Sequence, residues 1–409
     1  MTYAQTAPAD VPPPPPAPPA DMAAPPAGTA TPPPPPMAPP PAAPPSAVEA
    51  APKPPTATET MPATRPDVLP PIDVGAWLRV GGKFQGQDPS KVNDWHMDNA
   101  YVELHAGGKV HKNVGVTLNL NANMTGWSPS GVPTQASLVA LEDAIISFDF
   151  YDEFHVWAGH LLVPVDRANA SGPFFMIPWN YPGFFSGPFV GAPYEGPSGR
   201  NNGAVIWGDI AGGKFSYFAG AFDNAALSSS PLFSGKLRLA LWDPEPGFWG
   251  NGSFFGDKDM LSIDVGGQVQ KNGAINGTQT YGEVNVDALL EKKLGGGSFV
   301  TAEAAYYHFD QSAGGVSDSM YALLAYATPT VGVGNIQPMV RFQWEKVKDN
   351  TITNPWNLDV GLSYLIKGPA LRLLATYSYT KLLNVDATTM GLSNSTANSV
   401  QLGAQAIFF

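Results

Sequence analysis

The sequence contains no cysteine in its 409 residues, which excludes disulfides, thiol chemistry and cysteine-based zinc sites. It also lacks long apolar runs, because no stretch approaches the roughly 18 to 20 uncharged apolar residues that a membrane-spanning helix needs. Hydrophobic residues nevertheless make up 44% of the chain, and 43 residues are glycine. This combination is typical of a sheet with one face in lipid and the other in water.

Charged residues are also scarce, at 14% of the chain, and they are mostly acidic, with a net charge of −12. A nucleic-acid partner would need a basic face, so we expect none. None of the six histidines has a metal-ligand spacing, and no Ser-His-Asp order stands out. We therefore expect neither a cofactor nor an enzyme. An outer-membrane lipase or protease stays open as an alternative, which an assay of ester and peptide hydrolysis would test.

Proline divides the chain into two regions. Residues 1–71 hold 27 of the 44 prolines, set among alanine and threonine with almost no aromatic residues. Such a segment buries little surface and alternates between polyproline II and coil. We expect residues 1–71 to be a disordered, semi-rigid linker in the periplasm, and residues 72–409 to be the folded domain. The linker is either an inert spacer or a tether that contacts peptidoglycan or a periplasmic protein.

The first residues, Met1 to Ala7, have neither the basic head nor the apolar core of an export signal. Our hypothesis is that an export signal has been removed from this chain.

From Ile72 onward, apolar and polar residues alternate with a period of two. Val116, Leu118 and Leu120 alternate with asparagine and threonine, and Leu358, Val360 and Leu362 alternate with Asp359, Gly361 and Ser363. This period fits a strand that is wet on one face and does not fit a helix.

Sixteen such runs follow one another, and the connections between them differ in character. Short glycine-rich turns such as Gly107-Gly108-Lys109 and Gly295-Gly296-Gly297 alternate with longer polar loops. Short turns at one rim and long loops at the other are the arrangement of an outer-membrane barrel with an even strand number. The fold class is therefore an all-β, transmembrane antiparallel β-barrel of about 16 strands. The runs lie at about 72–84, 97–107, 112–125, 138–150, 154–164, 202–211, 214–223, 234–243, 260–271, 280–291, 298–309, 319–328, 336–347, 357–367, 370–382 and 399–409.

The connection after the fifth run, residues 165–201, is long and unusually aromatic. A structureless insertion of this length is generally functional or disordered, and its rings need a surface to lie on. We predict that it folds into the lumen and forms the pore constriction. The alternative is an external loop that packs on a neighbouring subunit. The predicted constriction residues are Arg167, Phe174, Phe175, Trp179, Tyr181, Phe184, Phe185 and Arg200.

Several segments resemble the phosphate-selective porin O and P family. They are Arg79 to Phe84, Gly159 to Val165, Asn202 to Asp209 and Trp242 to Trp249, of which the last would fill a periplasmic turn. The resemblance spans roughly residues 72–409 and implies a trimeric, sixteen-stranded porin constricted by its third loop. Phe409 ends the chain as in many outer-membrane barrels. Gln401 and Gln405 are in phase with it, however, which weakens that terminal assembly signal. The arginine ladder of the phosphate-binding members is not obvious here.

Placing the polar face of each strand inward gives eleven acids against six bases in the lumen. This excess predicts weak selectivity that leans to cations. Arg167 and Arg200, which flank the long loop, could form a local basic patch opposite acids. The predicted bases are Arg79, Lys83, Lys236, Arg238, Arg341 and Arg372, and the predicted acids are Asp73, Glu103, Asp143, Asp149, Asp209, Asp264, Glu283, Asp287, Glu303, Glu345 and Asp359.

The sequence thus predicts a porin in the outer membrane of a Gram-negative bacterium, in contact with lipid and assembled as a homotrimer. Small hydrophilic solutes and ions would diffuse through it passively. Two alternatives remain: an anion- or phosphate-selective porin, and a structural anchor tethered through residues 1–71. Conductance distinguishes the anchor from a porin, because a plugged barrel does not conduct.

Overall fold

The computed structural model describes residues 72–86, 94–124, 139–182, 199–223, 228–273, 278–311, 316–348, 354–381 and 396–408. The predicted linker 1–71 and Phe409 lie outside these ranges. Among the described residues, no helix is both long and apolar enough to cross a membrane.

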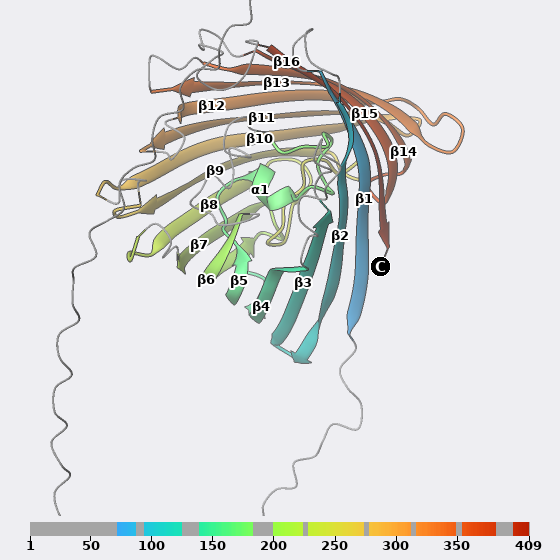
Figure 1. The fold of residues 1–409 in the computed structure, drawn as a ribbon. Coiled ribbons are helices and arrows are strands. Elements are labelled where there is room, and N and C mark those ends of the chain that lie inside the picture. The colour runs from blue at the N-terminus through green and yellow to red at the C-terminus, as the bar shows by residue number, and fades with distance from the viewer. Residues whose placement is uncertain are drawn as a thin grey trace, which may run out of the picture. The chain divides into compact units, whose positions relative to one another are not determined.

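The described residues form sixteen antiparallel strands that close into one barrel, which confirms the predicted fold class (Figure 1). Each strand pairs with its neighbours in the sequence. The strands are β1 (Asp73–Gly86), β2 (Asp94–His111), β3 (Val114–Met124), β4 (Ala140–Tyr151), β5 (Phe154–Leu162), β6 (Arg200–Ile210), β7 (Phe215–Asp223), β8 (Leu232–Ala240), β9 (Met260–Gln270), β10 (Tyr281–Gly295), β11 (Ser298–Asp310), β12 (Val316–Ala327), β13 (Asn335–Val347), β14 (Trp356–Lys367), β15 (Leu371–Lys381) and β16 (Thr396–Phe408).

The barrel closes where β1 pairs with β16, from Ala76 opposite Phe408 to Gly86 opposite Asn398. Closure matters because it leaves no strand edge with unpaired backbone groups, which lipid would not tolerate. The first and last strands of the sequence thus lie side by side in the structure, although about 300 residues separate them along the chain.

The two faces of the wall follow the period-two pattern. Val116, Val360 and Leu362 are exposed on the outside, whereas Asn119 and Asp359 are buried on the inside. An apolar outer face and a polar inner face are what a transmembrane barrel requires. The sequence pattern therefore identified the correct face of these strands.

One predicted turn is wrong. Gly107, Gly108 and Lys109 continue β2, and the chain turns at Lys112 and Asn113 instead. Gly107 pairs with Thr117 and Gly108 with Val116, so these glycines extend the ladder. Glycine favours turns but is also compatible with a strand, and tertiary pairing decides between the two.

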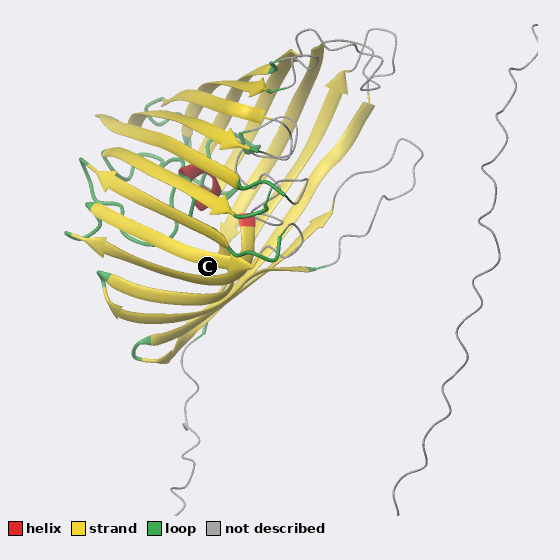
Figure 2. Ribbon diagram, turned by 90° about the vertical axis from the view of Figure 1, so that its left-hand side faces the viewer, coloured by secondary structure: helices red, strands yellow, loops and turns green. Residues whose placement is uncertain are grey.

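In the part of the chain that the structure describes, two connections enter the barrel. The first follows β5 and contains the helix α1 (Arg167–Ser171), which the strands surround in both views (Figures 1 and 2). The second joins β8 to β9 through residues 241–259, and its Gly250 N–H donates to the Ala170 carbonyl of α1 at 3.1 Å. The sequence predicts a periplasmic turn at residues 242–249, and in the structure Glu245 and Phe248 of this connection are buried.

Candidate functional site

The segment that enters the barrel after β5 is described for residues 163–182, and we call it the loop arm. Asp166 caps α1, because its Oδ1 accepts from the Asn169 N–H at 2.7 Å. Gly172 ends the helix with a φ of 61°, a conformation that glycine adopts without strain. The loop runs from residue 163 to 199, so the predicted boundaries 165–201 were slightly displaced, and Arg200 belongs to β6.

Side chains of the barrel wall hold the loop arm by its backbone. Each wall group donates a hydrogen bond to a main-chain carbonyl, and the donors come from four different strands. Polar wall residues thereby satisfy backbone groups that would otherwise be buried without partners. The pairs are Arg79 with Trp179 at 2.8 Å, Arg341 with Asn180 at 2.8 Å, Arg372 with Ile177 at 3.2 Å and Gln405 with Phe174 at 2.9 Å.

The aromatic side chains of the loop arm also pack on the wall. The rings of Phe174 and Phe175 lie 5.1 and 5.3 Å from Trp77 in edge-on contact. The Arg79 guanidinium lies 3.8 Å from the centre of the Trp179 ring. Phe174 and Trp179 are buried, Phe175 and Tyr181 are half-buried, and Phe184 and Phe185 lie outside the described residues. Among these described residues, the predicted aromatic residues pack within the barrel.

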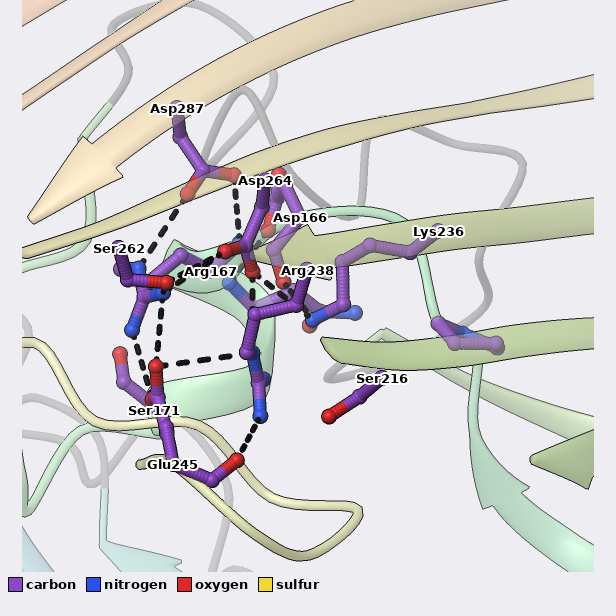
Figure 3. Close-up of polar contacts among 12 residues, drawn as sticks. Asp166, Arg167, Ser171, Ser216, Lys236, Arg238, Glu245, Ser262, Asp264 and Asp287 are labelled. Atoms are coloured by element: carbon purple, nitrogen blue, oxygen red, sulfur yellow. Dashed lines mark hydrogen bonds and ion pairs between the residues drawn. The ribbon is translucent and has the colours of Figure 1, made fainter. Parts of the chain in front are cut away.

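A buried ion network joins α1 to the strands β8 to β10 and to Glu245 (Figure 3). Arg167 lies at its centre, 2.8 Å from Glu245, 2.8 Å from Asp264 and 3.3 Å from Asp287. Arg238 contributes a second guanidinium, 3.3 Å from Asp264. Together with Lys236, which lies 3.7 Å from Asp264, these side chains form the ion network.

Charges within the network shift one another's pKa. Burial alone would lower the pKa of Arg167, but the carboxylates of Asp264 and Glu245 raise it well above its ordinary value. Burial would raise the pKa of Glu245, but the two arginines hold it below its ordinary value. Asp166, beside the network, differs: burial raises its pKa to about 7. Arg167 and Glu245 therefore both stay charged, whereas Asp166 is able to take up a proton near neutral pH.

A cavity of about 680 Å³ lies between the start of the loop arm and the wall of β1 to β4. Its wall carries Glu103, Glu142 and Asp143, which we call the acidic wall cluster. Among the described residues that line the cavity, Arg200 is the only lysine or arginine. Arg200 lies 3.1 Å from Glu142 and 3.2 Å from Asp143. Acids therefore exceed bases among the described residues that line this cavity, and Arg200 is paired with two of them.

Arg167 and Arg200 do not lie in one basic patch. Arg167 contacts acids of β9 and β10 together with Glu245, whereas Arg200 contacts acids of β4. Of the other predicted lumenal residues, Lys83 is half-buried and Asp73 is exposed. Glu283, Glu303 and Glu345 are buried on the inner face.

Sequence reasoning missed Glu142 and Glu245. The pairing of β3 with β4 shifts between Asn119 and Leu120, so Asn119 faces Asp143 and Leu120 faces Leu141. This bulge leaves two successive acids, Glu142 and Asp143, both buried. If successive side chains pointed strictly to opposite faces of the strand, only one of these two acids would face inward. Glu245 was missed because inward-facing acids were assigned from the strands alone, and Glu245 lies in a connection between two strands.

Within the described residues, no cluster of histidines and carboxylates has an arrangement that would hold a metal ion.

A closed sixteen-stranded antiparallel barrel with a connection folded inside it defines the fold of outer-membrane porins. Solved structures share this fold. The anion-selective porin from Comamonas acidovorans is 15% identical at a TM-score of 0.55, over 83% of this chain and 99% of its own. Pseudomonas putida OprB at high pH is 13% identical at a TM-score of 0.55, over 82% and 94%. The trimer form of Vibrio cholerae OmpT is 12% identical at a TM-score of 0.51, over 83% and 99%.

No family model matches this chain, and a search of curated proteins found no match either. Identities this low establish the shared fold alone.

Proposed function

We propose that this protein is an outer-membrane porin through which small hydrophilic solutes and ions diffuse passively, with a weak preference for cations. The observation that carries the proposal is the cavity beside the loop arm, whose acidic wall cluster faces a single arginine among its lining residues. Lumenal charge sets ion preference, because a cation next to carboxylates is stabilised and an anion is repelled. The loop arm is the constriction in this proposal, and the protein has no catalytic role.

An anion- or phosphate-selective porin is the second candidate. Arg79, Arg341 and Arg372 line one side of the barrel, and one protein of the same fold is described as an anion-selective porin. All three guanidinium groups donate to carbonyls of the loop arm, and Arg341 is also paired with Asp359 at 2.8 Å. Phosphate binding needs clustered donors that face the solute. These contacts therefore favour the cation-leaning porin over the resemblance to phosphate-selective porins.

The location and the oligomeric state of the protein belong to the same proposal. We place the barrel in the outer membrane of a Gram-negative bacterium, as a homotrimer, with residues 1–71 in the periplasm as a linker or a peptidoglycan tether. The apolar outer face supports the contact with lipid. A protein of the same fold described in a trimer form supports the oligomer. A structural anchor remains the third candidate.

Planar-bilayer recording of the purified protein in a potassium chloride gradient tests the proposal. Stable single-channel steps and a reversal potential displaced toward the potassium equilibrium potential are expected. An absence of conductance would favour the anchor. A reversal potential displaced toward chloride, with currents that saturate on addition of phosphate, would favour the anion-selective porin.

A further inference from the structure

Two glycines meet where the barrel closes. Gly81 of β1 and Gly403 of β16 are direct cross-strand partners. Neither has a positive φ, so the backbone conformation does not require glycine at these positions. Glycine inside a strand weakens it, and often marks a place where another group approaches closely.

The group that approaches both glycines is the indole of Trp179. A Cβ atom added to Gly81 would lie 2.9 Å from the indole Cζ2, and one added to Gly403 would lie 2.6 Å from Cη2. Real Cβ atoms do not come this close to a ring, so alanine at either position would displace the indole. At Gly81 the added atom would also meet the Leu402 carbonyl, whereas at Gly403 the nearest atoms are all from Trp179.

The neighbours of the glycine pair fix the rest of this part of the loop arm. The Arg79 guanidinium donates to the Trp179 carbonyl and lies over the indole. On β16, Gln405 donates to the Phe174 carbonyl, and Gln401 accepts from the Asn180 side chain at 3.2 Å. The indole therefore lies between two points at which the same strand binds the loop arm.

We propose that Gly81 and Gly403 are positioning residues that form a side-chain-free seat for Trp179, and that the depth of the indole in this seat sets the cross-section of the pore. This inference rests on the proposed porin function. The absence of two side chains lets the loop arm lie against the wall, because its ring occupies the space that two methyl groups would fill. A side chain at Gly403 lifts the indole and carries the loop arm toward the centre of the lumen.

Single-channel conductance of Gly403→Ala tests this proposal. The variant is expected to lose conductance and to exclude larger sugars in liposome-swelling assays. Gly282→Ala is the matched control, because it adds a methyl group to another barrel strand where the nearest atom is the Asp310 Cβ at 3.8 Å. The control should conduct like the wild type. Unheated gel mobility of every variant reports whether the barrel has folded.

A double-mutant cycle shows whether Gly403→Ala acts by displacing the Trp179 indole or by disturbing the barrel wall in general. In a Trp179→Ala background no indole remains to be displaced, so Gly403→Ala should have no further effect on conductance. If Gly403→Ala alone prevents folding, the proposal requires that Trp179→Ala restores it. The proposal is overturned if Gly403→Ala conducts like the wild type, or if its effect or folding defect persists in the Trp179→Ala background. A wild-type barrel that does not conduct would instead refute the porin function.

Discussion

The Arg167 guanidinium extends from α1 to the barrel wall and lies 2.8 Å from the Asp264 carboxylate on β9, with both side chains fully buried. Asp264 is contacted in addition by Arg238 and Lys236, so one carboxylate is shared by three bases. A buried pair of this kind contributes little net stability compared with an apolar pair, but loss of one partner leaves an uncompensated buried charge. The ion network therefore fixes where α1 lies inside the barrel.

Removal of the central guanidinium should strongly destabilise the barrel. Arg167→Met leaves Glu245, Asp264 and Asp287 with one fewer counter-charge, and breaking a buried pair costs about 3–5 kcal/mol. Denaturant unfolding in detergent micelles measures the loss. Lys292→Met is the control, because Lys292 and Asp259 form an ion pair that is exposed to solvent. Exposed pairs contribute little, so the control should unfold like the wild type. Equal stability of the two variants would show that α1 does not depend on the network.

The fold could be predicted because its information is local. A barrel wall with water on one side and lipid on the other requires apolar and polar residues to alternate along each strand. Neighbours such as Leu118 and Asn119 show this alternation directly in the sequence. The closure of β1 on β16 and the antiparallel order then follow, since a barrel in lipid cannot leave an open edge.

The site could be predicted only in part, because its contacts are between distant segments. In the sequence, Gln401 and Gln405 only weaken the terminal assembly signal, but in the structure they bind the loop arm. The bulge that turns Glu142 inward depends on pairing between β3 and β4 and leaves no mark in the period of the sequence. The polar face of the strands predicts that Arg79, Arg341 and Arg372 point inward, and in the structure all three donate to the loop arm. Their binding to carbonyls of the loop arm depends on the tertiary structure, which the sequence pattern does not report.

A charge on the outer face should be costly near the middle of the membrane. Leu118 is 40% exposed on the outside of β3, so Leu118→Arg would place a guanidinium in lipid. The expected destabilisation is about 2–4 kcal/mol at mid-bilayer depth. Reversible unfolding in lipid vesicles measures it. Val333→Arg is the comparison, since Val333 lies in the turn between β12 and β13 and should cost little. Unchanged stability of the Leu118 variant would contradict the assignment of this face to lipid.

Stability should fall as the pH rises through the range in which Asp166 ionises. Burial raises the pKa of Asp166 from 3.8 to about 7, so the folded state holds this proton more tightly than the unfolded chain. The stabilisation is complete below about pH 4 and is lost toward pH 7, by at most about 1.4 kcal/mol per pH unit for one proton. The carboxylate of Glu283 also raises this pKa, whereas the ammonium of Lys236 lowers it.

Asp166→Asn isolates this contribution, because asparagine keeps the side-chain oxygen that caps α1 but has no proton to lose. Thermal unfolding of both proteins from pH 4 to 8 is the measurement. The wild type should lose stability across this range more steeply than the variant. Parallel curves would mean that Asp166 ionises at its ordinary pKa.

Ion preference should depend on the acidic wall cluster. Tyr101, Asn121 and Arg200 all bind Glu142, and Glu142→Gln removes one negative charge while it keeps the shape of the side chain. Cation preference should therefore fall, with little change in conductance at high salt. Reversal potentials at about 0.1 M and 1 M salt measure this, because the screening length shortens from about 10 Å to about 3 Å between them. The difference between wild type and variant should be large at low salt and small at high salt.

Asp310→Asn is the control. It removes a charge from the exposed end of β11, outside the lumen, and should leave selectivity unchanged. If both variants shift selectivity equally, the preference arises from the total charge of the protein, and the cavity beside the loop arm is not the path that the ions follow.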